Sequence, residues 1–108
     1  MNKRAKKKVE KRRRALVHQI LDVVLDINGT GCRKKEYTGN MPTAFFEFSG
    51  HTSGVRIEIY GDGWGDDDQS EEEKFSSDGY LCREWSVEYV LAKARAEAAA
   101  LREKGVIL

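Results

Sequence analysis

The side chains that could do chemistry in this chain are charged, and they lie in two blocks of opposite sign. Residues 3–14 carry nine Lys or Arg side chains and a single acid, Glu10. Cations in such a run can neutralise phosphates and release the counterions that surround a nucleic acid, which gives affinity without reading the base sequence. The predicted nucleic-acid-binding residues are Lys3, Arg4, Lys6, Lys7, Lys8, Lys11, Arg12, Arg13 and Arg14. The alternatives are a solubilising tail and a tail that pairs with the chain's own acidic block.

The second block is acidic and extends from residue 62 to residue 78, where Lys74 is the one base among eight Asp and Glu residues. Dense carboxylates can steer a protein toward a basic cleft on a partner, and Trp64 beside them could be a desolvated anchor. The predicted protein-binding residues are Asp62, Trp64, Asp66, Asp67, Asp68, Glu71, Glu72 and Glu73. The alternatives are an ordinary solvated loop for the acids and burial at the edge of the core for Trp64.

Patterns for catalysis and metal binding are poorly met. Residues 49–53 place two serines, His51 and a threonine in one short loop, but a nucleophile and base also need an orienting group and an oxyanion hole. The two His and two Cys are not at zinc-ligand spacing. The acidic block fails the calcium-loop pattern because Ser77 stands where the twelfth-position Glu is required. We therefore predict a protein that is not an enzyme and that needs no metal or cofactor.

Two helices and three strands are expected to position these blocks. The apolar residues between Leu16 and Ile27 follow helical spacing, and Asn28-Gly29 is a helix stop. This predicts a helix over residues 12–28, which the basic run could prolong although its cations oppose the helix dipole. Residues 43–49 and 55–60 alternate between apolar and polar side chains, which indicates an antiparallel hairpin, and a third strand is expected within residues 74–83.

The last helix is expected over residues 86–104, with Ser86 as its N-cap, Trp85 and Val90 as a hydrophobic staple, and Gly105 at its end. The fold class is thus α+β: a helix, a three-stranded antiparallel sheet and a second helix (αβββα), with both helices on one face of the sheet. The strand residues expected in the core are Phe46, Phe48, Val55, Ile57 and Ile59. The predicted organisation is a basic N-terminal extension, residues 1–14, followed by one domain, residues 15–108.

Hydropathy and cysteine content point to a compartment. No apolar run approaches the roughly 20 residues that span a bilayer, so no contact with a membrane is expected. Cys32 and Cys82 suit free thiols in a reducing compartment. We expect a cytoplasmic protein.

One segment resembles a known group of proteins. Residues 45–51 (FFEFSGH), followed by residues 57–64 (IEIYGDGW), are similar to small proteins encoded by phages and prophages of Gram-positive bacteria. The resemblance is a strand–turn–strand signature, so it implies an origin in a mobile element, hence a cytoplasmic location in the host cell, and assigns no functional residues.

Two further groups share only the order of elements. Double-stranded RNA-binding domains open their second helix with a Lys-rich motif, whereas this chain has Ser86-Val87-Glu88-Tyr89 there. Some phage anti-CRISPR proteins also combine a small helix–sheet–helix fold with an acidic surface that occupies a nuclease's DNA-binding cleft, and the acidic block here is similar in kind.

Two functions follow as hypotheses. The first is a non-catalytic, anti-CRISPR-like inhibitor or modulator that binds a host nucleic-acid-handling protein or ribonucleoprotein through the acidic block. The alternative is direct, sequence-tolerant binding of DNA or RNA through the basic extension. The sequence also leaves a homodimer open.

Overall fold

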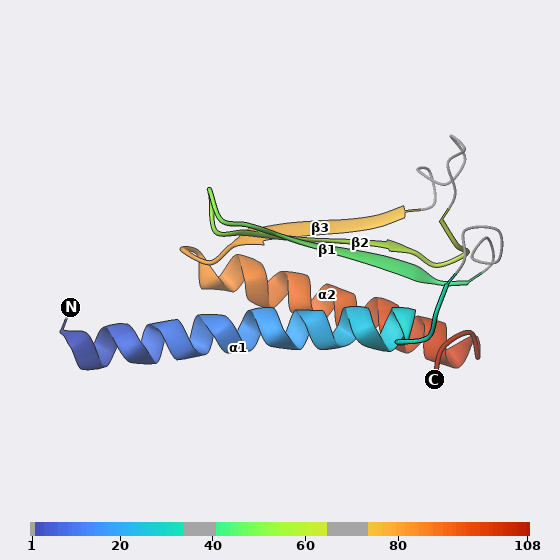
Figure 1. The fold of residues 1–108 in the computed structure, drawn as a ribbon, viewed down its shortest axis with the longest axis horizontal. Helices are drawn as coiled ribbons and strands as arrows, with labels where there is room; N and C mark the ends of the chain where they lie inside the picture. Colours follow the sequence, from blue (N-terminus) through green and yellow to red (C-terminus); the bar gives the residue numbers. More distant parts are fainter. Residues whose placement is uncertain (1, 34–40, 65–73) are drawn as a thin grey trace.

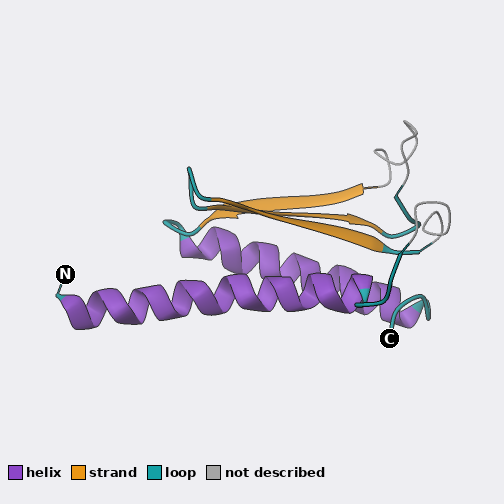
Figure 2. Ribbon diagram, viewed as in Figure 1, coloured by secondary structure: helices purple, strands orange, loops and turns teal. Residues whose placement is uncertain are grey.

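The computed structural model describes residues 2–33, 41–64 and 74–108. The elements follow the order α1 (Lys3–Asn28), β1 (Thr43–Ser49), β2 (Gly54–Tyr60), β3 (Lys74–Tyr80) and α2 (Glu84–Glu103). The strands form one antiparallel sheet in the order β1-β2-β3, and both helices cover the same face of it (Figures 1 and 2). The predicted αβββα fold is confirmed.

The core lies between the sheet and the two helices. The inward side chains of β2 (Val55, Ile57 and Ile59) are almost completely buried, as the alternation of that strand predicts. The side of α2 that faces the core includes the small, fully buried Ala94 and Ala98, which let this helix approach its neighbours closely.

Strand β1 departs from its prediction, because its inward face is only partly covered. Phe46 packs against the core but keeps some exposure, and Phe48 is 47% exposed. β1 is an edge strand, and near Phe48 the surface is hollowed between the hairpin and α1. Phe48 was therefore wrongly predicted as a core residue.

The start of α2 also departs from its prediction. The helix begins at Glu84, after Arg83 as its N-cap residue, so Ser86 already lies within the first turn. The Ser86 hydroxyl accepts a hydrogen bond from the backbone N–H of Tyr80 at 2.8 Å and donates to the carbonyl oxygen of Arg83 at 2.6 Å. Trp85 is 69% exposed and forms no staple. Ser86 therefore ties α2 to the end of β3, which continues unbroken to Tyr80.

Helix α1 begins nine residues earlier than residue 12, so the basic run does prolong it. The side chain of Asn2 caps the helix by accepting a hydrogen bond from the backbone N–H of Ala5 at 2.8 Å. At the other end Gly29 adopts a φ of 68°, the left-handed region that favours glycine. The predicted helix stop is confirmed, and the basic residues belong to a continuous helix.

Two expectations about the chain's surroundings can be compared with the structure. Over the described residues, neither helix combines the length and the apolar character required to cross a membrane. Cys32 and Cys82 are both exposed free thiols.

Candidate nucleic-acid interface

The N-terminal part of α1 projects beyond the rest of the molecule (Figure 1). The two helices run parallel, because Arg12 meets Glu84 and, further along, Arg102 meets Asp26. Since Glu84 is the first residue of α2, the turns of α1 that precede Arg12 extend past the start of that helix. Residues 3–11 span about 14 Å at 1.5 Å per residue.

Most of the predicted nucleic-acid-binding residues lie on the side of α1 that faces away from the core. The buried residues of α1, such as Ile20 and Ile27, mark the side that packs against the sheet and α2. At 3.6 residues per turn, Arg4, Lys7 and Lys11 fall on the opposite side. The remaining cations of the projecting turns lie on both flanks of that line, so that cations cover an arc of about 200° around the helix. We call this surface the cationic arc; its members are Lys3, Arg4, Lys6, Lys7, Lys8 and Lys11.

Three of the nine predicted cations are held by carboxylates of the chain. Arg12 donates from Nε and Nη2 to the two carboxylate oxygens of Glu84 at 2.6 and 3.0 Å, and Arg13 donates from Nε to Glu84 at 3.0 Å. Arg14 pairs with Glu10 one turn earlier at 2.9 Å. Within the described ranges, no ion pair involves a member of the cationic arc. The structure thus divides the basic run into three tethered arginines and six cations available to a ligand.

The Glu84 carboxylate is the anchor of the basic helix. Its side chain is only 18% exposed and lies between two guanidinium groups. The hydrogen bond from Arg12, reinforced by the one from Arg13, lowers the pKa of Glu84 below its usual value. The same hydrogen bond raises the pKa of Arg12. Glu84 and Arg12 therefore stay charged at neutral pH, and the two ion pairs of Glu84 fix the base of the projecting helix to α2.

A hollow adjoins the base of the projecting turns. It has a volume of about 400 Å³ and lies between α1, the β1–β2 hairpin and the segment after β3. Its apolar lining includes Val17 and Phe48, and its polar rim includes Glu10, Arg13 and Arg14. Phe48 is thus exposed to a surface that continues into the basic helix.

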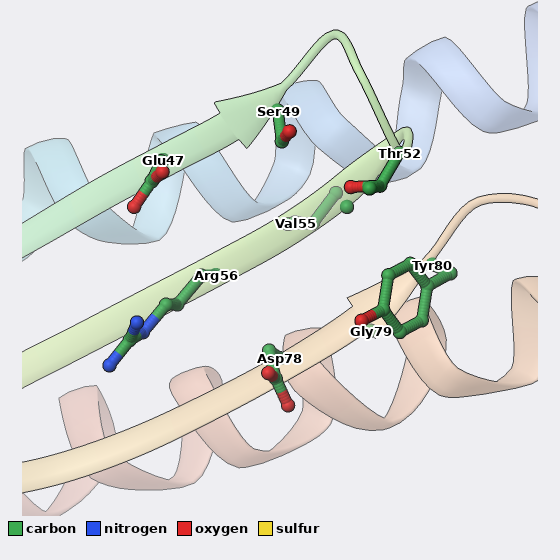
Figure 3. Close-up of a pocket in the computed structure, with 9 residues that line it drawn as sticks. Glu47, Ser49, Thr52, Val55, Arg56, Asp78, Gly79 and Tyr80 are labelled. Atoms are coloured by element: carbon green, nitrogen blue, oxygen red, sulfur yellow. The ribbon is translucent and has the colours of Figure 1, made fainter.

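A second, smaller hollow lies on the open face of the sheet, away from the helices (Figure 3). It holds about 140 Å³, and the middle of its lining is a row of side chains from all three strands: Glu47, Arg56 and Asp78. Arg56 also pairs with Glu58 on its own strand at 2.8 Å. Three carboxylates, those of Glu47, Glu58 and Asp78, thus lie near one guanidinium, so this group of side chains has a net negative charge.

The loop that carried the weak catalytic pattern shows no catalytic arrangement in the described structure. His51 is exposed, and no hydrogen bond between described residues joins it to Ser49, Thr52 or Ser53. Likewise, no group of three or more His, Cys, Asp or Glu side chains in the described ranges is placed to hold a metal ion.

The predicted protein-binding surface is described only at its start. Asp62 is exposed, and Trp64 is half-buried, with its ring 5.6 Å from that of Phe45 at 67°. Phe45 also contacts Tyr60 edge-to-face at 5.8 Å, as expected for a packed aromatic pair. The other predicted members lie outside the described residues: Asp66, Asp67, Asp68, Glu71, Glu72 and Glu73.

The described start of the acidic block is far from the basic turns. Asn28, at the end of α1, exchanges two hydrogen bonds with the backbone of Ala44 on β1, and Ala44 pairs with Ile59 near the end of β2. Asp62 and Trp64 follow that end, so they lie at the opposite end of the molecule from the N-terminus of α1 (Figure 1). The basic run is tethered by Glu84 and Glu10, and neither belongs to the acidic block.

Sequence reasoning missed Glu84, the residue that positions the interface. It is separated from Arg12 by 72 positions, and only the parallel packing of the two helices brings them together. A sequence signal exists, since an acid in the first turn of a helix is favoured by the helix dipole. Comparisons with protein-family models, with curated proteins and with solved structures found no match for this chain.

Proposed function

We propose that this protein binds nucleic acid, without reading its base sequence, through the cationic arc of α1. The observation that supports this proposal is that six cations on a projecting helix have no ion-pair partner among the described residues. Each phosphate that such a cation neutralises releases a condensed counterion, which favours binding. The arc consists of five lysines and one arginine, and the ammonium group of lysine binds phosphate as a compact point charge.

The surroundings of the arc favour the same ligand. Arg12 and Arg13 hold the base of the helix against Glu84, so the arc projects from a fixed point on the folded domain. Asp62, the described start of the acidic block, follows the end of β2, which lies beside the C-terminal end of α1 through Ala44 and Asn28, so it is remote from the arc. An anionic polymer can therefore approach the basic turns without meeting that part of the acidic block.

The inhibitor hypothesis stays a prediction. Of its protein-binding residues, only Asp62 and Trp64 are described, and Trp64 already packs against Phe45. An anti-CRISPR-like protein would bind its target through the acids that follow.

The test is a titration of labelled nucleic acid at several salt concentrations. If the arc engages six phosphates of a duplex, the logarithm of the association constant falls with the logarithm of salt concentration with a slope of about −5, from 0.9 per phosphate. The double variant Lys7→Gln/Lys11→Gln should make this slope shallower by about 2. A matched control, Lys93→Gln/Lys104→Gln, removes the same charge from exposed positions of α2 and its C-cap, and it should leave most of the slope unchanged.

Two results would contradict the proposal. One is the absence of binding to any DNA or RNA at low salt. The other is an equal loss in both double variants, because that would show a response to net charge rather than to the arc. All four lysines are exposed, so each variant should remain folded, and its thermal melt checks this.

A further inference from the structure

We infer that the nucleic acid bound by the cationic arc is B-form duplex DNA, with the projecting turns of α1 lying in its major groove. This inference rests on the proposed function and goes beyond it by naming the ligand. Two observations support it: the wide arc that the cations cover around α1, and the projection of these turns beyond the rest of the molecule.

The arc is wider than a single phosphate strand requires. Lys6 lies on one flank of the helix and Lys8 on the other, while Lys7 and Lys11 lie between them, directly opposite the core side. A helix resting on one strand can present only its central line to phosphates. A helix between two strands meets phosphates on both flanks at once, and this arrangement engages Lys6 and Lys8 together.

The dimensions of the groove select the form of the duplex. An α-helix with its side chains is about 10–12 Å across, and the major groove of B-form DNA, about 12 Å wide, admits it. The major groove of A-form RNA is deep and narrow and does not. The projecting length of about 14 Å is enough for the helix to cross the B-form groove.

The projecting helix is free of neighbours on the sides that must enter. Its turns extend past the start of α2 (Figure 1), and the side that faces the core carries Ala5 and Val9, which are half-buried. Asn2, the one amide side chain at this end, is engaged in capping the helix through Ala5. Apart from Glu10, which is paired with Arg14, the turns that enter the groove thus present phosphate-binding cations and no free amide for reading adenine, which agrees with sequence-tolerant binding.

The experiment measures the association constant of the full chain for duplex DNA, duplex RNA and single-stranded DNA at several salt concentrations. The three ligands have the same length and the same arbitrary base sequence. If the two flanking lysines meet phosphates only in the B-form groove, the salt slope should be steeper by about 1.8 on duplex DNA than on duplex RNA. The flank variant Lys6→Gln/Lys8→Gln should remove that difference. The central variant Lys7→Gln/Lys11→Gln should weaken binding to both duplexes alike.

A second variant tests the helix separately from its charge. Val9→Pro keeps every cation but breaks the helix in the projecting turns, because proline removes a hydrogen bond and clashes with the preceding turn. Val9 is outside the buried core, so the melt of the domain should be close to that of the parent. The steeper slope on duplex DNA should disappear, while binding to single-stranded DNA persists.

The outcomes separate the two proposals. No binding to any of the three ligands overturns the proposed function, and this inference with it. Two results would overturn the inference that α1 lies in the major groove and would leave the proposed function intact. One is an equal salt slope on duplex DNA and duplex RNA, and the other is a salt slope on duplex DNA that Val9→Pro does not change. A steeper DNA slope that is lost in both the flank variant and Val9→Pro supports the groove.

Discussion

Gly79→Ala tests the close contact between β3 and the first turn of α2, the turn that carries Glu84. Gly79 pairs with Val55 in the sheet and faces α2. A Cβ atom at this position would lie 2.7 Å from the carbonyl carbon of Ser86 and 2.8 Å from its oxygen. Both are backbone atoms of the first turn of α2, so no side-chain rotation relieves the contact, and the helix must move away from β3. Overpacking of this kind costs about 1–3 kcal/mol.

The assay is urea denaturation followed by circular dichroism. With a slope of about 1–3 kcal/mol per molar urea for a small protein, the midpoint should fall by about 1 M without a change in slope. The matched control is Gly50→Ala, where an added Cβ meets nothing within 4 Å. Both substitutions restrict the unfolded chain to a similar degree, so the difference between them isolates the contact with Ser86.

The same substitution has a consequence for the interface. Glu84 is in the same first turn as Ser86, so a displaced turn moves the carboxylate that anchors Arg12 and Arg13. Gly79→Ala should therefore weaken nucleic-acid binding at salt concentrations where the domain is still folded. A midpoint equal to that of Gly50→Ala would refute the reasoning, because it would show that β3 and α2 are not in contact as described.

Two further predictions concern the anchor and the core. Hydrogen bonds lower the pKa of Glu84 in the folded state, so its contribution to stability is present above its unfolded pKa and is lost as pH falls through the lowered folded value. In thermal melts recorded at decreasing pH, Glu84→Gln should lack this pH-dependent loss of stability. Parallel curves of melting temperature against pH for parent and variant would contradict the role of Glu84 as an anchor. Ile57→Ala removes a fully buried side chain and should lower the free energy of unfolding, measured by urea denaturation, by about 2–5 kcal/mol. Phe48→Ala should cost much less, because Phe48 is half exposed. Equal losses would contradict the observed difference in burial between Ile57 on β2 and Phe48 on β1.

The helices, the hairpin and the fold class could be predicted because they depend on local patterns. Helical spacing up to Ile27 and strict alternation in β2 each identify a buried face within one element. The stop at Gly29 also follows from one residue's conformational freedom. These signals need no knowledge of which elements are neighbours.

The errors arise where the outcome depends on another element. Alternation places Phe48 on the inward face of β1, but only the extent of α1 under an edge strand decides whether that face is covered. Ser86 has the side chain of a helix cap, yet the short connection from β3 starts α2 at Glu84, and the hydroxyl binds Tyr80 instead. The basic run was identifiable as a set, but the tethering of Arg12 and Arg13, which sets them apart from the cationic arc, required the position of Glu84.

That division determines what kind of ligand site the basic run can be. A disordered tail must order each residue on binding, at about 1–2 kcal/mol per residue in backbone entropy alone. Here Asn2 caps the helix at one end, and Glu84 fixes its base through Arg12 and Arg13, so much of this ordering is already complete. Repulsion among the cations and their unfavourable position near the helix N-terminus oppose the helix, and an anionic ligand relieves both. In the proposed function, Arg12 and Arg13, which are neutralised by Glu84, thus have the role of holding the other cations in a fixed geometry. The near-zero net charge of the whole sequence conceals this division of labour.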